Sequence, residues 1–143
     1  LSNGVVGELR AALDVLRNRP EVEAERVGAI GFCMGGSYAL QLACVDDNLR
    51  AASVFYGQNP RPLDAVADSC PIVGSYPEKD FTASAARQLE ARLEAHQVAH
   101  DFKIYPDARH SFFNDTGPAY NAEAAADAWK RTLAFFEKHL QTA

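Results

Sequence analysis

The chain has 143 residues, of which 48% are hydrophobic and 23% are charged, and its formal net charge is −5. This length suits one domain over residues 1–143, and the negative charge argues against nucleic acid or an anionic membrane as the main partner. No apolar run is long enough for a membrane-spanning helix, and no signal-peptide pattern opens the chain.

The alternation of apolar residues predicts strands and helices in turn along the chain. We expect a helix over about 4–18, a strand over 26–31, a helix over about 34–45, a strand over 51–56, a strand over 71–74, a helix over about 82–96, a strand over 101–105 that ends at Pro106, and a helix over about 118–140. This order predicts an α/β fold with a parallel sheet of about four strands and helices on both faces.

The segment 31–36, Gly-Phe-Cys-Met-Gly-Gly, follows the first expected strand and leads into a helix. It has the G-x-nucleophile-x-G pattern of a nucleophile elbow, with cysteine in the place of serine. Glycine is expected at Gly31 and Gly35 because larger side chains would collide in so sharp a turn. The helix N-terminus favours the thiolate form of Cys33. The alternative is a buried structural cysteine at a tight strand–helix junction.

A cysteine nucleophile needs a base, and the base needs an orienting acid, in the chain order nucleophile, acid, histidine. His110 follows the last strand and is the expected base. Asp80 follows the third strand and is the expected acid, while Glu78 and Asp107 are nearby competitors. The backbone N–H of Met34 is the expected oxyanion donor.

Apolar side chains near the elbow predict a small hydrophobic substrate pocket, with ordinary core packing as the alternative. Its expected lining residues are Phe32, Met34, Tyr56, Phe112 and Phe113. Three cysteines, Cys33, Cys44 and Cys70, form no disulfide framework, and we interpret Cys44 and Cys70 as structural. Free thiols indicate a cytoplasmic location. No C-x-x-C or H-E-x-x-H pattern is present, so we expect no metal site.

Four segments together resemble the dienelactone hydrolase (carboxymethylenebutenolidase) family. They are the elbow at 31–36, Phe-Tyr-Gly at 55–57, Lys-Asp-Phe at 79–81 and Tyr-Pro-Asp-Ala-Arg-His-Ser-Phe at 105–112, where Arg109 stands in the usual place of glycine. The resemblance implies an α/β-hydrolase without a cofactor, in which Cys33, Asp80 and His110 form a triad. The implied substrate is a small lactone or carboxylic ester, cleaved through an acyl-cysteine.

The resemblance covers only the later part of the family's fold. Family members carry earlier strands, which supply the second oxyanion donor and a glutamate that pairs with the resting cysteine. The resemblance also places Asn114 in the substrate pocket. It stands where the founding enzyme has an arginine that binds the substrate carboxylate, so bidentate anion recognition is not expected there.

The strand at 26–31 would then lie at an open edge of the sheet, which is an aggregation hazard unless it is covered. We expect a homodimer or a partner segment at this edge. Two other functions remain open at this point. The chain could be a non-catalytic fragment or scaffold domain that needs a partner segment, or a thiol redox protein built on Cys33.

Overall fold

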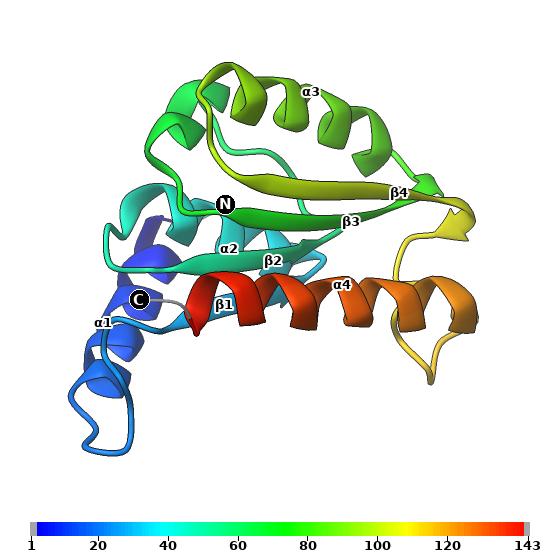
Figure 1. Cartoon of the computed structure of the whole chain (residues 1–143). Coiled ribbons are helices and arrows are strands. Elements are labelled where there is room, and N and C mark those ends of the chain that lie inside the picture. Colours follow the sequence, from blue (N-terminus) through cyan, green and yellow to red (C-terminus); the bar gives the residue numbers. More distant parts are fainter. Residues whose placement is uncertain (1–2, 142–143) are drawn as a thin grey trace.

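The computed structural model describes residues 3–141 of the chain (Figure 1). The elements are, in order, α1 (Asn3–Arg17), β1 (Gly28–Phe32), α2 (Met34–Val45), β2 (Ala51–Phe55), the short 3-10 helix η1 (Leu63–Asp68), β3 (Ile72–Lys79), α3 (Thr82–Ala95), β4 (His100–Arg109) and α4 (Ala122–Leu140). The four strands form one parallel sheet in the order β1-β2-β3-β4. The predicted fold class, an α/β fold with a parallel sheet, is confirmed.

Helices cover both faces of the sheet, with α3 and α4 on opposite sides (Figure 1). Side chains of β2 pack on both faces of the sheet, because successive side chains of a strand point in opposite directions. Val54 joins a cluster with Leu40 of α2 and with Leu89 of α3. Ala51, three residues earlier in the same strand, lies with Phe135 of α4 on the other face.

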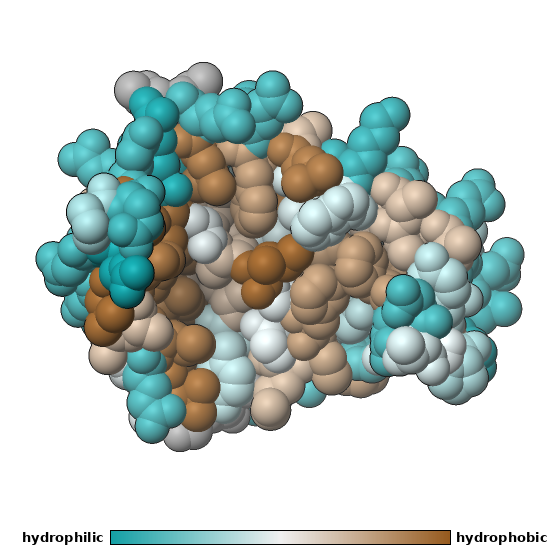
Figure 2. Space-filling view, turned by 90° about the horizontal axis from the view of Figure 1, so that it is seen from below, coloured by the Kyte–Doolittle hydropathy of each residue, from teal (hydrophilic) through white to brown (hydrophobic). Residues whose placement is uncertain are grey.

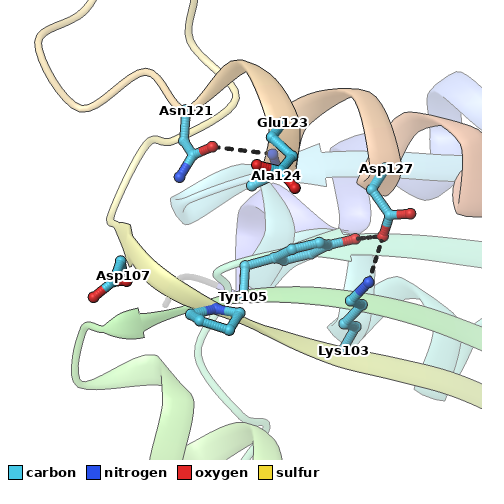
Figure 3. A pocket seen from close by; sticks show the side chains of 8 residues that line it. Lys103, Tyr105, Asp107, Asn121, Glu123, Ala124 and Asp127 are labelled. Carbon is cyan, nitrogen blue, oxygen red and sulfur yellow. Dashed lines mark hydrogen bonds and ion pairs between the residues drawn. The ribbon is translucent and has the colours of Figure 1, made fainter.

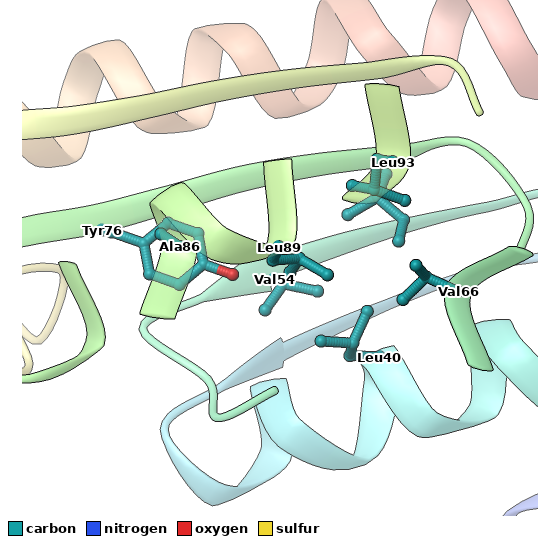
Figure 4. Close-up of a cluster of buried hydrophobic side chains, with 8 residues drawn as sticks. Leu40, Val54, Val66, Tyr76, Ala86, Leu89 and Leu93 are labelled. Atoms are coloured by element: carbon teal, nitrogen blue, oxygen red, sulfur yellow. The ribbon is translucent and has the colours of Figure 1, made fainter. Parts of the chain in front are cut away.

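The largest hydrophobic cluster fills the space between the sheet and the helices α2 and α3 (Figure 4). Its buried members are Leu40, Val54, Val66, Ile72, Tyr76, Ala86, Leu89 and Leu93. Val66 enters this cluster from η1, an element that the sequence pattern did not predict. The cluster holds the elbow helix and the helix after Asp80 against the same face of the sheet.

Helix α4 is held on its face of the sheet by polar contacts as well as apolar ones. The hydroxyls of Ser53 and Thr132 are buried and lie 3.0 Å apart. The guanidinium of Arg131 donates hydrogen bonds to the Ser75 hydroxyl and to the carboxylate of Asp101. Such a fully paired network fixes the position of α4 along the strands.

Two predicted strand ends and one helix start were wrong. β3 continues past Gly74 to Lys79, and β4 continues past Pro106 to Arg109, because an irregularity in the pairing accommodates the proline. Helix α4 begins at Ala122 rather than at 118. The Asn121 side chain caps it there by accepting the N–H of Ala124 at 3.0 Å.

Within residues 3–141, none of the helices combines the length and the apolar character that crossing a bilayer would require.

Candidate active site

Cys33 occupies the sharp turn between β1 and α2. Its backbone has φ 58° and ψ −123°, a conformation that L-residues rarely adopt, and it is the N-cap of α2. The Cys33 N–H donates a hydrogen bond to the carbonyl of Phe55 at 3.0 Å, which ties the turn to the end of β2. This strained, tethered turn is the geometry that a nucleophile elbow requires.

The two glycines of the motif have different roles. A Cβ on Gly31 would stand 2.0 Å from the carbonyl oxygen of Gly35, so only glycine fits at that position. A Cβ on Gly35 would meet no heavy atom within 4 Å among the described residues. The expectation that both positions exclude a side chain is therefore wrong for Gly35, because the close approach involves its backbone only.

The three predicted triad residues come together at the carboxyl ends of the strands. The Nε2 atom of His110 lies 3.1 Å from Cys33 Sγ, and its Nδ1 atom lies 2.9 Å from a carboxylate oxygen of Asp80. The hydroxyl of Thr82, at the start of α3, donates to the same Asp80 oxygen. Asp80 is thereby oriented by its own helix while it orients the imidazole.

The electrostatics of the site lower the pKa of Cys33 and raise the pKa of His110. The hydrogen bond from His110 is the largest effect on Cys33, and together with the Met34 N–H it lowers the pKa of the thiol against the opposing effect of burial. Burial alone would lower the pKa of His110, but its hydrogen bonds to Asp80 and Cys33 outweigh burial and raise it. The two partners thus shift toward a state in which the proton resides on the imidazole.

The other two cysteines have the opposite environment. Burial raises the pKa of Cys44 to about 11 and that of Cys70 to about 12. Both thiols are therefore protonated and unreactive near neutral pH, in keeping with the structural role predicted for them.

Two aromatic rings frame the imidazole of His110. The ring of Tyr56 lies 4.8 Å from it, and the ring of Phe81 lies 6.3 Å away and nearly parallel, at 13°. The sequence analysis did not single out Phe81 as a pocket residue, although it directly follows the predicted acid. Phe81 is 65% exposed and also lines a cavity of about 460 Å³ together with Gln58 and Arg61, and none of the triad residues lines this cavity.

The predicted pocket residues divide into two groups. Phe32 is partly exposed and stacks on Phe113 at 5.2 Å, so both lie at the surface near the elbow. Phe112 is completely buried, and Tyr56 is 3% exposed. Phe112 packs in the core beneath the site, which corrects its assignment as a lining residue. The Asn114 side chain accepts hydrogen bonds from the N–H and hydroxyl of Thr116, and it stabilises a turn.

A further cavity, of about 420 Å³, lies between β4 and the start of α4 (Figure 3). Its wall includes Tyr105, whose hydroxyl donates to Asp127 at 2.8 Å, and Lys103, whose ammonium group lies 2.9 Å from the same carboxylate. The triad residues do not line it. Across residues 3–141, no cluster of three or more His, Cys, Asp or Glu side chains is arranged to hold a metal ion.

Comparisons with known proteins point to one family. The model of the dienelactone hydrolase family matches residues 2–140. A protein of Saccharolobus solfataricus named as a candidate carboxymethylenebutenolidase is 41% identical over 116 residues, which are 80% of this chain and 45% of that protein. A Bradyrhizobium protein named as a candidate 2-oxo-3-(5-oxofuran-2-ylidene)propanoate lactonase is 33% identical over 149 residues, covering 95% of this chain and 60% of that protein.

A solved structure gives the same result. The crystal structure of a candidate dienelactone hydrolase from Klebsiella pneumoniae has a TM-score of 0.85 and 28% sequence identity, and the match covers 94% of this chain and 61% of that chain. This chain spans about half the length of the curated relatives it matches. The family match nevertheless includes the elbow and both segments that carry Asp80 and His110. By this match, the chain belongs to the dienelactone hydrolase family.

Proposed function

We propose that this protein hydrolyses a small lactone or carboxylic ester through a covalent acyl-cysteine. One observation carries the proposal: His110 lies between Cys33 Sγ, at 3.1 Å, and the carboxylate of Asp80, at 2.9 Å. A nucleophile, a base and an orienting acid within hydrogen-bond distance are the arrangement that nucleophilic acyl transfer needs. The lactonase name of the Bradyrhizobium relative supports the same class of substrate.

In the first half-reaction, the thiolate of Cys33 attacks the carbonyl carbon, and a carbon–sulfur bond forms while the carbonyl oxygen becomes an oxyanion. Collapse of this intermediate breaks the bond between the carbonyl carbon and the leaving oxygen. The imidazolium of His110 donates its Nε2 proton to that oxygen. The result is a thioester on Cys33 and an alcohol, which remain joined in one molecule when the substrate is a lactone.

In the second half-reaction, neutral His110 takes a proton from water, and the hydroxide adds to the thioester carbonyl. The thiolate of Cys33 then leaves, and the carboxylic acid is released. This step regenerates the thiolate and the imidazolium, which the hydrogen bond to Asp80 stabilises.

The oxyanion formed in both steps needs hydrogen-bond donors at fixed positions. The N–H of Met34, the first residue of α2, contributes to the lowered pKa of the Cys33 thiol and is suited to stabilise the oxyanion. We propose that the second donor comes from a further segment, of the kind that the relatives carry outside the matched region.

The substrate space that we propose includes the cavity of about 460 Å³ that Phe81 lines. Phe81 also stacks on His110, and we propose that a substrate held in this cavity extends past Phe81 to the triad, whose own residues do not line the cavity. Phe32 and Phe113 give an apolar surface at the elbow. Asn114 supplies no cation, so we propose that recognition does not depend on a substrate carboxylate at this position.

We further propose that the open edge of β1 is covered by a polypeptide segment of the kind that the longer relatives carry. β1 pairs with β2 on one side, and four exposed apolar side chains lie on the face shared with α4: Ile30, Phe32, Trp129 and Leu133. Figure 2 shows apolar groups across the middle of the face seen from below, with hydrophilic groups at its rim. A strand edge beside such a face favours association with another chain segment.

Hydrogen exchange tests this covering. The N–H groups of residues 28–32 that point away from β2 should exchange slowly with solvent in a monomeric sample of the full-length protein. Slow exchange that appears only in a dimer would mean that a second copy covers the edge instead. Fast exchange in every state would contradict a covered edge.

Free thiols at all three cysteines suit a reducing compartment, and we propose a cytoplasmic location on that ground.

Trapping of the acyl-enzyme tests the proposed hydrolysis. Brief incubation with p-nitrophenyl acetate should add one acetyl group to Cys33, seen by peptide mass spectrometry, and should release nitrophenolate in a burst. Cys33→Ala should abolish both, whereas Cys44→Ala should leave them unchanged. Unchanged turnover in Cys33→Ala would contradict the proposal. Absence of both acetylation and turnover in the wild-type protein would favour a scaffold domain that retains the elbow without using it.

A further inference from the structure

Two acids besides Asp80, namely Glu78 and Asp107, compete for its role in the sequence, and the structure brings these two together. Both lie close to the triad, one at the end of β3 and the other at the end of β4. The N–H of Asp107 donates a hydrogen bond to the Glu78 carboxylate at 3.0 Å. Neither acid bonds to His110, whose Nδ1 partner is Asp80.

This contact lies within an irregularity of the β3–β4 pairing. Pro77 pairs with Tyr105, and Lys79 pairs with Arg109. Between these pairs, β3 has one residue and β4 has three, so β4 carries two additional residues at this point. An insertion of this kind is a β-bulge, which re-aims the chain and is frequent beside active sites.

The bulge determines which residue of β4 lies beside Asp80. Arg109 and Lys79 are paired, and the residues that follow them directly are His110 and Asp80. Without the two additional residues, the regular register would place Ala108 beside Asp80. His110 would then lie two residues further along, about 7 Å at the usual rise of a strand, and its 2.9 Å contact with Asp80 would be lost.

The bulge has a backbone that needs support. Asp107 has φ 61°, in the left-handed region that is unfavourable for residues other than glycine. Its neighbour Pro106 has no N–H to contribute to the pairing. The Glu78 carboxylate accepts the N–H of Asp107, a residue that has no partner opposite it in the β3–β4 register. The ammonium group of Lys79, 3.3 Å from the Asp107 carboxylate, adds a solvent-exposed ion pair of small effect.

We propose that Glu78 is a positioning residue, which fixes the bulge in β4 through the N–H of Asp107 and so holds His110 between Asp80 and Cys33. The inference deepens the proposed function and rests on the triad described there. Glu78 acts through the backbone of β4 and makes no contact with the reacting atoms.

The test compares Glu78→Ala with Glu78→Gln, whose amide oxygen can still accept the Asp107 N–H. Glu94→Ala, a change at an exposed glutamate of α3, is the matched control. Two readouts are needed: the ¹⁵N resonances of the His110 imidazole, and the pH dependence of Cys33 alkylation by iodoacetamide. The first reports the contact with Asp80 directly, even if Cys33 is not a nucleophile.

We expect Glu78→Ala to move the His110 resonances and to raise the midpoint of Cys33 alkylation by about one pH unit, which slows alkylation about tenfold at pH values below both midpoints. Glu78→Gln and Glu94→Ala should remain close to wild type. Wild-type His110 resonances in Glu78→Ala would overturn the inference, even if the variant melts at a lower temperature. An ordinary thiol midpoint in the wild-type protein would instead count against the proposed function.

A second pair of variants tests the bulge without touching Glu78. Asp107→Gly suits a positive φ and keeps the N–H, so the His110 resonances should stay at their wild-type positions. Asp107→Val strains the same backbone and should shift them as Glu78→Ala does. Equal shifts in both variants would show that the Asp107 side chain, and not the bulge, positions His110, and would overturn the inference.

Discussion

Replacement of Gly31 by alanine should prevent the elbow from forming. The new Cβ would stand 2.0 Å from the Gly35 carbonyl oxygen and 2.3 Å from its carbon, whereas real Cβ contacts stay above 3.0 Å. The backbone must therefore shift by about 1 Å at a turn that the Cys33 N–H ties to Phe55. Because backbone atoms cannot rotate away as a side chain can, we expect a loss of about 3 kcal/mol or more in the free energy of unfolding.

Gly35→Ala is the matched control, two residues beyond the nucleophile in the same motif. Its Cβ meets no described atom within 4 Å, and the position is helical. Alanine there should stabilise the protein by about 0.5–1 kcal/mol, because glycine is a poor helix former. The two substitutions add the same methyl group, so their difference isolates the steric role of Gly31.

Urea denaturation of both variants, followed by circular dichroism, measures the difference, and Cys33 alkylation at neutral pH reports whether the elbow survives. We predict a lower midpoint and slow alkylation for Gly31→Ala, with neither change for Gly35→Ala. Equal stability of the two variants would refute the steric argument. A destabilised Gly35→Ala would contradict the open space found beside Gly35.

Three further changes test other parts of the structure. Thr132→Val should cost about 1–3 kcal/mol in the free energy of unfolding by leaving the Ser53 hydroxyl buried and unpaired, and the double variant with Ser53→Ala should recover part of that loss in urea denaturation. Asp80→Asn should raise the alkylation midpoint of Cys33 and slow ester turnover by about 10³-fold or more, because His110 loses its anionic partner; unchanged turnover would contradict that role. Because folding raises the pKa of His110, its protonation should increase the free energy of unfolding. This contribution should be fully present below about pH 6.5, the ordinary histidine value, and should disappear as the pH rises through the folded-state pKa. His110→Asn should remove that pH dependence, and its persistence would assign it to another group.

Much of the fold could be predicted because its signals are local. Each strand of the sheet has an apolar segment of its own, and the helices have apolar residues at helical spacing. The elbow was recognisable since one short segment combines a strand end, two glycines and a helix start. The chain order of Cys33, Asp80 and His110 then placed all three at the carboxyl ends of parallel strands, where the structure brings them together.

The parts that could not be predicted depend on contacts between distant segments. Pro106 indicates the end of a strand in isolation, yet β4 continues because Glu78, in another strand, supports the bulge. Phe112 is as apolar as Phe113, and only the packing of the core decides that Phe112 is completely buried. The role of Phe81 depends on its distance from His110, which no local pattern encodes.

The most direct test of the central claim is the pH dependence of alkylation at each cysteine, resolved by peptide mass spectrometry. Cys44 and Cys70 are internal controls, because burial raises their pKa to about 11 and about 12. We predict that Cys33 reacts with a midpoint below the ordinary thiol value of about 8.5 and loses that shift in His110→Asn. A Cys33 midpoint at or above the ordinary value would contradict the thiolate–imidazolium pair and the hydrolysis proposed for it.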